Sequence, residues 1–214
     1  MHRLGAILVL VSMSLLRSEI IDRVAVTVGT DVITASDVLE EIRVTAFLNG
    51  DKPDFTADAR RKAAGRLVEQ ALIGREMDAG QFPAPEPSDV SRMLEDVKKQ
   101  RFASEPEYRR TLTEFRLQEE DVVRHLFKQL ATLRFIDLRF RPAVQILDAD
   151  LWEYYRYKLV PQWEDKAAKP PSFEEARSKV EEILKQQRVD QTLDNWIKEM
   201  RNRIRIEYHE VAFQ

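Results

Sequence analysis

An alternation of apolar and polar residues near the N-terminus predicts a β-hairpin. Val24, Val26 and Val28 are separated by smaller or more polar residues, which is the two-residue period of a half-buried strand. Residues typical of turns follow at positions 29–31, and residues 32–34 can return as a second strand. We therefore expect a tight hairpin that leads directly into a helix.

Apolar residues at helical spacing occupy most of the chain after the hairpin. The expected helices run over residues 37–47, 56–79, from 88 or 89 through 97, 104–115, 119–140, 149–158 and 172–203. In the helix over 119–140, Val123, Leu126 and Phe127 fall on one side and are expected to face inward. The pattern predicts a mainly α protein.

Capping residues mark where these helices begin and end. Thr34 or Ser36 can accept hydrogen bonds from the free amides that open the first helix. The pairs Ser104–Glu107 and Ser172–Glu175 have the spacing of capping boxes. Gly80 stands where a helix often ends on a glycine.

A second alternating segment closes the chain. Ile204 and Ile206 alternate with charged residues, so residues 203–209 are expected to form a strand. Because a two-stranded hairpin is only marginally stable alone, the simplest partner for this strand is the hairpin over residues 24–34. We expect a small antiparallel sheet that joins the two ends of the chain around a body of helices.

The first 18 residues have the pattern of an export signal. A basic start precedes an uncharged, mostly apolar run from Leu4 to Leu16, which is shorter than the roughly 20 residues that span a bilayer. We expect residues 1–18 to be cleaved and the protein to be periplasmic or otherwise exported, without stable membrane insertion. The alternatives are a buried N-terminal helix and an uncleaved anchor.

Composition excludes several classes of function. Lys and Arg total 34 against 37 Asp and Glu, and loss of Arg3 and Arg17 with the leader would lower the net charge from −3 to −5. Nucleic acid is therefore not an expected partner, because phosphate binding needs a basic surface. The chain has no phosphate-binding glycine loop and no cysteine, so nucleotide and thiol chemistry are not expected either.

Four stretches of the chain, taken in their order, are similar to those of a known family. They are Asp22–Asp37 (DRVAVTVGTDVITASD), Leu67–Val90 (LVEQALIGREMDAGQFPAPEPSDV), Ile146–Tyr155 (ILDADLWEYY) and Phe173–Glu207 (FEEARSKVEEILKQQRVDQTLDNWIKEMRNRIRIE). Together they resemble the chaperone module of SurA-type periplasmic folding factors and the related exported parvulin-type prolyl isomerases. The resemblance implies a helical chaperone module with a small antiparallel sheet.

One domain of the full-length members of that family has no counterpart in this chain. Full-length members carry a parvulin domain between the third and fourth stretches, whereas this chain has only residues 156–172 there and no glycine after Gly80. We expect residues 19–160 to form the N-terminal chaperone region, residues 161–172 to replace the parvulin domain as a linker, and residues 173–214 to complete the same module.

The histidines and hydroxyls offer little chemistry. His125 has acidic neighbours but no second ligand at a usable spacing, so neither a metal site nor an acid–base site is expected. Ser36 has no histidine base nearby in the sequence. We expect no catalytic residue, no metal and no cofactor.

Aromatic residues gather between positions 152 and 163. They either pack against the terminal helix or line a crevice for peptides, because aromatic side chains offer a large contact area at low entropy cost. The candidate peptide-binding residues are Trp152, Tyr155, Trp163, Phe115 and Met93.

The sequence thus predicts an ATP-independent chaperone for unfolded outer-membrane or secreted polypeptides, which it would hold in a groove between the N-terminal helices and the terminal helix. A prolyl isomerase and a dedicated assembly partner of another exported protein are the alternatives. The oligomeric state is left open.

Overall fold

The fold is known from a computed structural model, which describes residues 22–163 and 169–214. The expected export signal over residues 1–18 lies outside these ranges, as does part of the expected linker over 161–172. The expected fold class is confirmed, because the described chain is mainly helical with one small antiparallel sheet.

Helices α1 to α7 follow the periodicity of the sequence. They are α1 (Ala35–Asn49), α2 (Ala57–Ala79), α3 (Pro87–Arg101), α4 (Glu105–Glu114), α5 (Glu119–Arg139), α6 (Asp148–Tyr154) and α7 (Phe173–Arg203). Four short helical turns complete the set: η1 (Arg141–Ala143), the π-turn η2 (Tyr155–Leu159), η3 (Val160–Trp163) and η4 (Glu210–Phe213).

The sheet joins the two ends of the described chain, as the sequence predicts. Its strands are β1 (Val24–Val28), β2 (Asp31–Thr34) and β3 (Ile206–Tyr208), and their order across the sheet is β2-β1-β3. Val28 lies opposite Asp31 on one side and opposite Ile206 on the other. Gly29 turns the hairpin with a φ of 62°, a conformation that favours glycine. Strand β2 and strand β3 are therefore the two edges.

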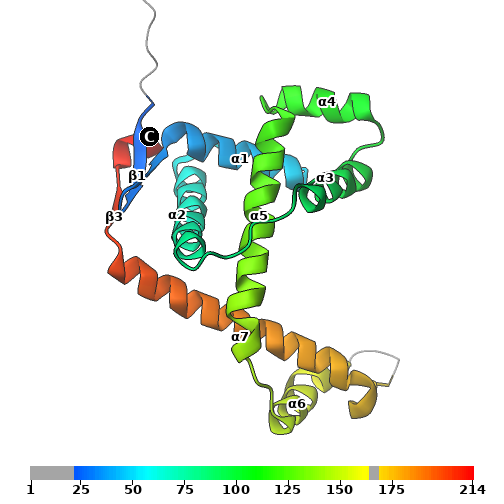
Figure 1. Ribbon diagram of the computed structural model, residues 1–214. Coiled ribbons are helices and arrows are strands. Elements are labelled where there is room, and N and C mark those ends of the chain that lie inside the picture. The colour runs from blue at the N-terminus through cyan, green and yellow to red at the C-terminus, as the bar shows by residue number, and fades with distance from the viewer. Residues whose placement is uncertain (1–21, 164–168) are drawn as a thin grey trace, which may run out of the picture.

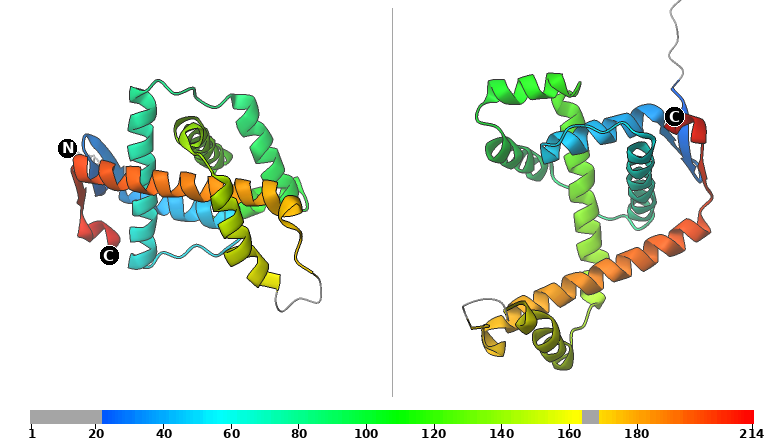
Figure 2. Two further views of the ribbon diagram at one scale, coloured as in Figure 1. Left: turned by 90° about the horizontal axis from the view of Figure 1, so that it is seen from below. Right: turned by 180° about the vertical axis from the view of Figure 1, so that it is seen from behind.

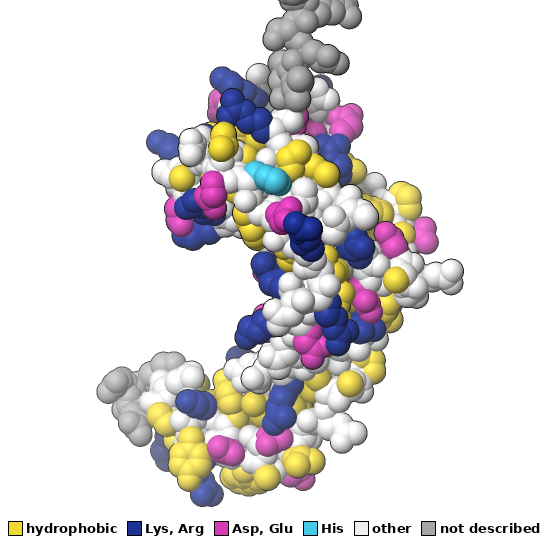
Figure 3. Space-filling view, turned by 90° about the vertical axis from the view of Figure 1, so that its left-hand side faces the viewer, with side chains coloured by type: hydrophobic (Ala, Val, Ile, Leu, Met, Phe, Trp, Pro, Cys, Tyr) yellow, Lys and Arg dark blue, Asp and Glu magenta, His cyan; other side chains and the backbone are white. Residues whose placement is uncertain are grey.

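The helices form an open, curved body beside this sheet. Helix α1 leads away from the sheet, α2 lies next to it, and α5 runs lengthwise through the molecule with α3 and α4 on its far side (Figures 1 and 2). Helix α7 crosses below them and connects the lobe formed with α6 to the edge strand β3. In side view the surface is hollowed between the upper body and this lobe (Figure 3).

The main core lies between the sheet, α1 and α2. Its buried cluster consists of Ala25, Val26, Val28, Ile33, Val38, Ile42, Ala63, Ala64, Val68, Leu72 and Phe213. Phe213 belongs to η4 and is 1% exposed, whereas Val211 in the same turn is 63% exposed. The C-terminal turn therefore completes a core that the N-terminal hairpin begins.

Three smaller clusters fix the remaining helices. One joins α1, α3, α4 and α5, a second joins α2, α5 and α7, and the last joins α6 and α7. In the second of these, Phe135 is fully buried, with its ring centroid 5.7 Å from that of Trp196 on α7. Helix α7 is thus held by α5 near its middle and by α6 at its start.

The structure corrects two local predictions and confirms a third. Phe127 is 39% exposed, because α5 buries a neighbouring stripe of residues that includes Val122, Leu126 and Phe135. The expected glycine at the end of α2 is confirmed, because Gly80 is the C-cap of this helix; its φ is −88°, and the next residue, Gln81, has a positive φ of 52°. Helix α3 begins at Pro87, without a side-chain cap.

Candidate functional site

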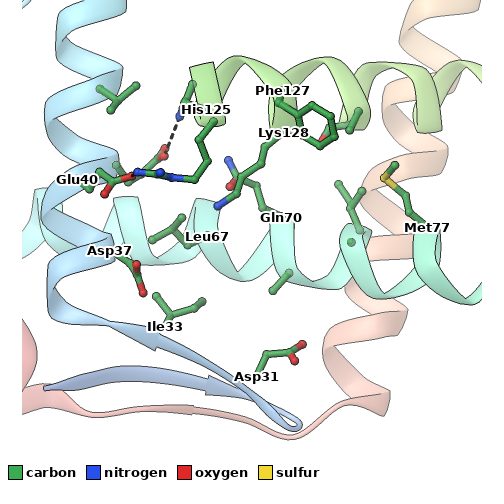
Figure 4. A pocket seen from close by; sticks show the side chains of 18 of the residues that line it. Asp31, Ile33, Asp37, Glu40, Leu67, Gln70, Met77, His125, Phe127 and Lys128 are labelled. Carbon is green, nitrogen blue, oxygen red and sulfur yellow. Dashed lines mark hydrogen bonds and ion pairs between the residues drawn. The ribbon is translucent and has the colours of Figure 1, made fainter. Parts of the chain in front are cut away.

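An open pocket lies where β2, α1, α2 and α5 meet (Figure 4). Its volume is about 400 Å³, within the range of roughly 300–1,000 Å³ that is usual for ligand sites. It is lined by Asp31, Val32, Ile33, Asp37, Glu40, Glu41, Val44, Leu67, Gln70, Ala71, Ile73, Gly74, Met77, Asp78, Arg124, His125, Phe127, Lys128, Ala131 and Thr132. No residue of α7 lines it, so it is not the groove expected beside the terminal helix.

Helix α2 supplies an apolar floor. Leu67, Ala71 and Gly74 follow one another at spacings of four and three residues, so they share a face of the helix, and Met77 continues it. A Cβ atom added at Gly74 would meet no heavy atom within 4 Å. The missing side chain at Gly74 therefore leaves part of the pocket open.

A buried carboxylate stands in the wall between α1 and α5. Glu41 is 6% exposed and accepts hydrogen bonds from Arg66 Nε at 2.9 Å and from the Thr45 hydroxyl at 3.2 Å. His125 Nδ1 lies 3.3 Å from its second oxygen. Burial raises the pKa of Glu41, but the contacts with His125 and Arg66 outweigh burial and hold the pKa below its ordinary value.

This arrangement favours a structural role for Glu41 over acid–base chemistry. A carboxylate that is ionised and contacted by three side chains has no proton to donate and little freedom to accept one. The partly buried His125, which the sequence left without a partner, is tied to the same group. The wall of the pocket is thus fixed by a charge network that local spacing did not reveal, because its members lie on three different helices.

Charged side chains also surround the mouth of the pocket. Asp31 pairs with Arg75 at 3.1 Å, and Glu40 pairs with Arg124 at 2.9 Å. In Figure 4, Lys128 extends from α5 into the space above α2. Lys128 is exposed and has no ion pair within residues 22–163 and 169–214.

Three of the predicted peptide-binding residues lie together at the other end of the molecule. The Trp152 ring stacks on Phe173 with centroids 3.7 Å apart, and the Tyr155 hydroxyl donates to the Pro171 carbonyl at 2.7 Å. Trp163 ends the turn η3 that follows. We call this region, with Trp152, Tyr155, Trp163 and Phe173, the aromatic end. Trp152 is 46% exposed, so one side of its ring remains open to solvent.

The other two predicted residues lie in neither region. Phe115 is half-buried, with its ring centroid 5.7 Å from that of Phe47. Met93 packs against the same cluster of α1, α3, α4 and α5. Both side chains contribute to packing there, and neither lines the pocket.

Two kinds of site are absent from the part of the chain that the structure describes. Among residues 22–163 and 169–214, no group of three or more His, Cys, Asp or Glu side chains is arranged to hold a metal ion. In the same ranges, no helix combines the length and the apolar character that crossing a membrane requires.

Comparison with known proteins adds no assignment. Neither the family models nor the curated proteins compared with this chain gave a match. The resemblance to SurA-type folding factors therefore stays a prediction from the sequence.

Proposed function

We propose that the protein is an ATP-independent chaperone that holds unfolded polypeptides in the pocket above α2. The observation that carries this proposal is the pocket itself, which is open at the surface and has an apolar floor. Such a site suits short apolar segments that an unfolded chain exposes and a folded one buries. The proposed clients are unfolded outer-membrane or secreted polypeptides in the periplasm or another exported compartment, as the resemblance implies.

The surroundings of the pocket support binding over catalysis. Two of the acids that line it are already paired: Glu40 with Arg124, and Glu41 with Arg66 and His125. Catalytic groups need a protonation state or a nucleophile poised for reaction, and these paired carboxylates offer neither. The apolar floor, in contrast, is free to contact a ligand.

Suppression of client aggregation tests this function. An outer-membrane β-barrel protein unfolded in urea is diluted into buffer without nucleotide, and light scattering is followed with and without the chaperone. We expect the natural sequence to suppress scattering. Absence of suppression at several-fold molar excess would contradict the proposed function.

Two glycines of α2 provide a matched pair of variants. Gly74→Leu places a side chain in the pocket, whereas Gly65→Leu places the same side chain on the same helix outside it. A Cβ atom at either position meets nothing within 4 Å, and both changes raise helix propensity equally. We expect Gly74→Leu to reduce suppression strongly and Gly65→Leu to leave it unchanged. Equal suppression by both variants would place client binding elsewhere.

A further inference from the structure

The pocket lies at the free edge of the sheet. Strand β2 is the outermost strand in the order β2-β1-β3, and of the three strands only β2 contributes lining residues. Figure 4 shows the same arrangement, with β2 bordering the pocket. An edge strand presents backbone N–H and C=O groups that another extended chain can pair with.

The register identifies which of these groups face outward. A two-residue turn closes the hairpin at the pair Val28–Asp31, and the next pairs are Thr27–Val32 and Val26–Ile33. Opposite residues alternate between pairs that exchange hydrogen bonds and pairs that do not, and the pair closing such a turn is a bonded one. The N–H and C=O of Val32 therefore point away from β1, toward the pocket. Val32 is also 53% exposed.

We propose that a client segment binds as a fourth strand on the free edge of β2 and places alternate side chains in the pocket. This inference rests on the proposed function and specifies how the client is held. Backbone pairing would supply affinity for any extended chain, and the pocket would select among side chains.

The dimensions fit a strand in this position. Neighbouring strands lie about 4.8 Å apart, and residues i and i+2 share a face. In β2, Asp31 and Ile33 share the face that looks over the floor formed by α2. An added strand would continue that face, so that its own alternate residues would lie above Leu67 and Ala71. Helix α5, with the partly exposed Phe127, bounds the space on the opposite side.

The charged residues that line the pocket indicate which charge a client segment should carry. Five carboxylates line the pocket against two Lys or Arg residues. Arg66 and Arg75 offset two of these acids from outside, and Arg124 pairs with a third, so that Asp37 and Asp78 remain without an ion pair in the described part of the chain. A strand with apolar residues alternating with lysine or arginine complements this site better than an acidic one. Alternation of apolar and polar residues is also the pattern of the strands in membrane β-barrels.

Backbone methylation of a peptide tests pairing directly. The probe is a fluorescein-labelled peptide of about nine residues in which leucine alternates with lysine and threonine, and binding is measured by fluorescence anisotropy. Two further peptides carry N-methyl groups on the odd or on the even amides of the central residues. Since only one set of amides can face β2, we expect one methylated peptide to bind at least about tenfold more weakly and the other within about threefold of the parent. We also expect hydrogen exchange of the Val32 amide to slow when the parent peptide binds.

Other outcomes would overturn the inference. No binding of the parent peptide, or equal effects of the two methylated peptides, would exclude a fourth strand. Tighter binding of a peptide with glutamate in place of lysine would overturn the charge preference inferred for the client. A dimer that the peptide does not dissociate would assign the edge to a second copy of the chain. If the two methylated peptides bind differently but the protein does not suppress aggregation, the strand site is retained and the chaperone function is rejected. If the protein suppresses aggregation but the two peptides bind equally, the chaperone function is retained and the strand site is rejected.

Discussion

The pocket and the aromatic end both bring apolar side chains to the surface, but they are built differently. Residues from four elements converge on the pocket, and the charge network around Glu41 fixes its wall. The aromatic end is local: Trp152 and Tyr155 lie within a short stretch of chain and pack on Phe173 from the start of the next helix. A concave site comes from distant segments, whereas a dense local cluster of aromatics mostly packs on itself.

The two regions are joined by α7, and the largest expected effect tests that connection. Phe213 is buried in the core under the sheet, so Phe213→Ala should lower the free energy of unfolding by about 3–5 kcal/mol. Denaturant unfolding is followed by circular dichroism and by tryptophan fluorescence. The chain has three tryptophans: Trp152 and Trp163 belong to the aromatic end, and Trp196 lies on α7. Their fluorescence therefore reports on the region away from the sheet.

We expect both signals to shift together, because α7 leads directly into β3. Val211→Ala, in the same terminal turn but exposed, is the control and should change stability by less than about 0.5 kcal/mol. If the fluorescence transition stays in place while the circular dichroism transition moves, the two regions unfold as separate units.

The fold could be predicted from the sequence where a signal was local or periodic. The alternation of Val24, Val26 and Val28 predicted a strand, which is β1. Ser172 and Glu175 form the capping box expected at the start of α7. The strand predicted near the C-terminus pairs with β1, as expected. Each of these depends on neighbours in sequence or on one repeated spacing. The pairing of the two ends of the chain could also be predicted, because the hairpin needed a third strand and only residues 203–209 had the pattern of one.

The pocket could not be predicted in the same way. Its lining runs from Asp31 to Thr132, and no single stretch differs from an ordinary amphipathic helix. In the sequence, Glu41 is next to apolar residues of its helix and His125 is close to acidic residues. Only tertiary packing brings these two side chains together. The aromatic residues between positions 152 and 163 are dense in the sequence, but a high density of aromatic residues along the chain does not predict a concave surface.

The charge network in the pocket wall gives the second largest effect and a dependence on pH. Glu41→Gln keeps the shape of the side chain but removes the charge that Arg66 and His125 contact, and should cost about 1–3 kcal/mol at pH 7. The pKa of Glu41 in the folded protein lies below its ordinary value of 4.5. The stability it contributes is therefore complete above about pH 4.5 and is lost as the pH falls through the lowered folded-state pKa.

Unfolding free energies of the natural chain and of Glu41→Gln, measured from neutral to acidic pH, check this prediction. The difference should be constant near neutrality and should shrink below about pH 4.5. Glu40→Gln serves as a control, since Glu40 forms a more exposed pair with Arg124 and should cost less than about 1 kcal/mol. A difference that grows on acidification would mean that Glu41 is protonated in the folded protein.

A smaller effect is expected at the aromatic end. Trp152→Ala removes a ring that stacks on Phe173 but is 46% exposed, so it should cost about 1 kcal/mol of stability. If the open side of the ring also contacts clients, suppression of aggregation should weaken, but less than in Gly74→Leu. Light scattering of both variants at equal concentration compares the regions directly. A larger loss in Trp152→Ala would move the main client surface from the pocket to the aromatic end.

The smallest predicted effect concerns the exposed cation at the pocket mouth. Lys128 has no ion pair in the described chain, and it would lie close to the lysines of a basic client strand. Because exposed charge pairs are worth only about 0.2–1 kcal/mol, Lys128→Ala should strengthen binding of the lysine-containing peptide by about two- to threefold, and the gain should fade in high salt. The stability of the protein itself should change little, since the side chain is exposed and forms no ion pair in the described chain. Weaker binding after Lys128→Ala would show instead that this amine contacts the client, through a backbone carbonyl or a carboxylate, and that the acidic lining does not set the charge preference of the pocket.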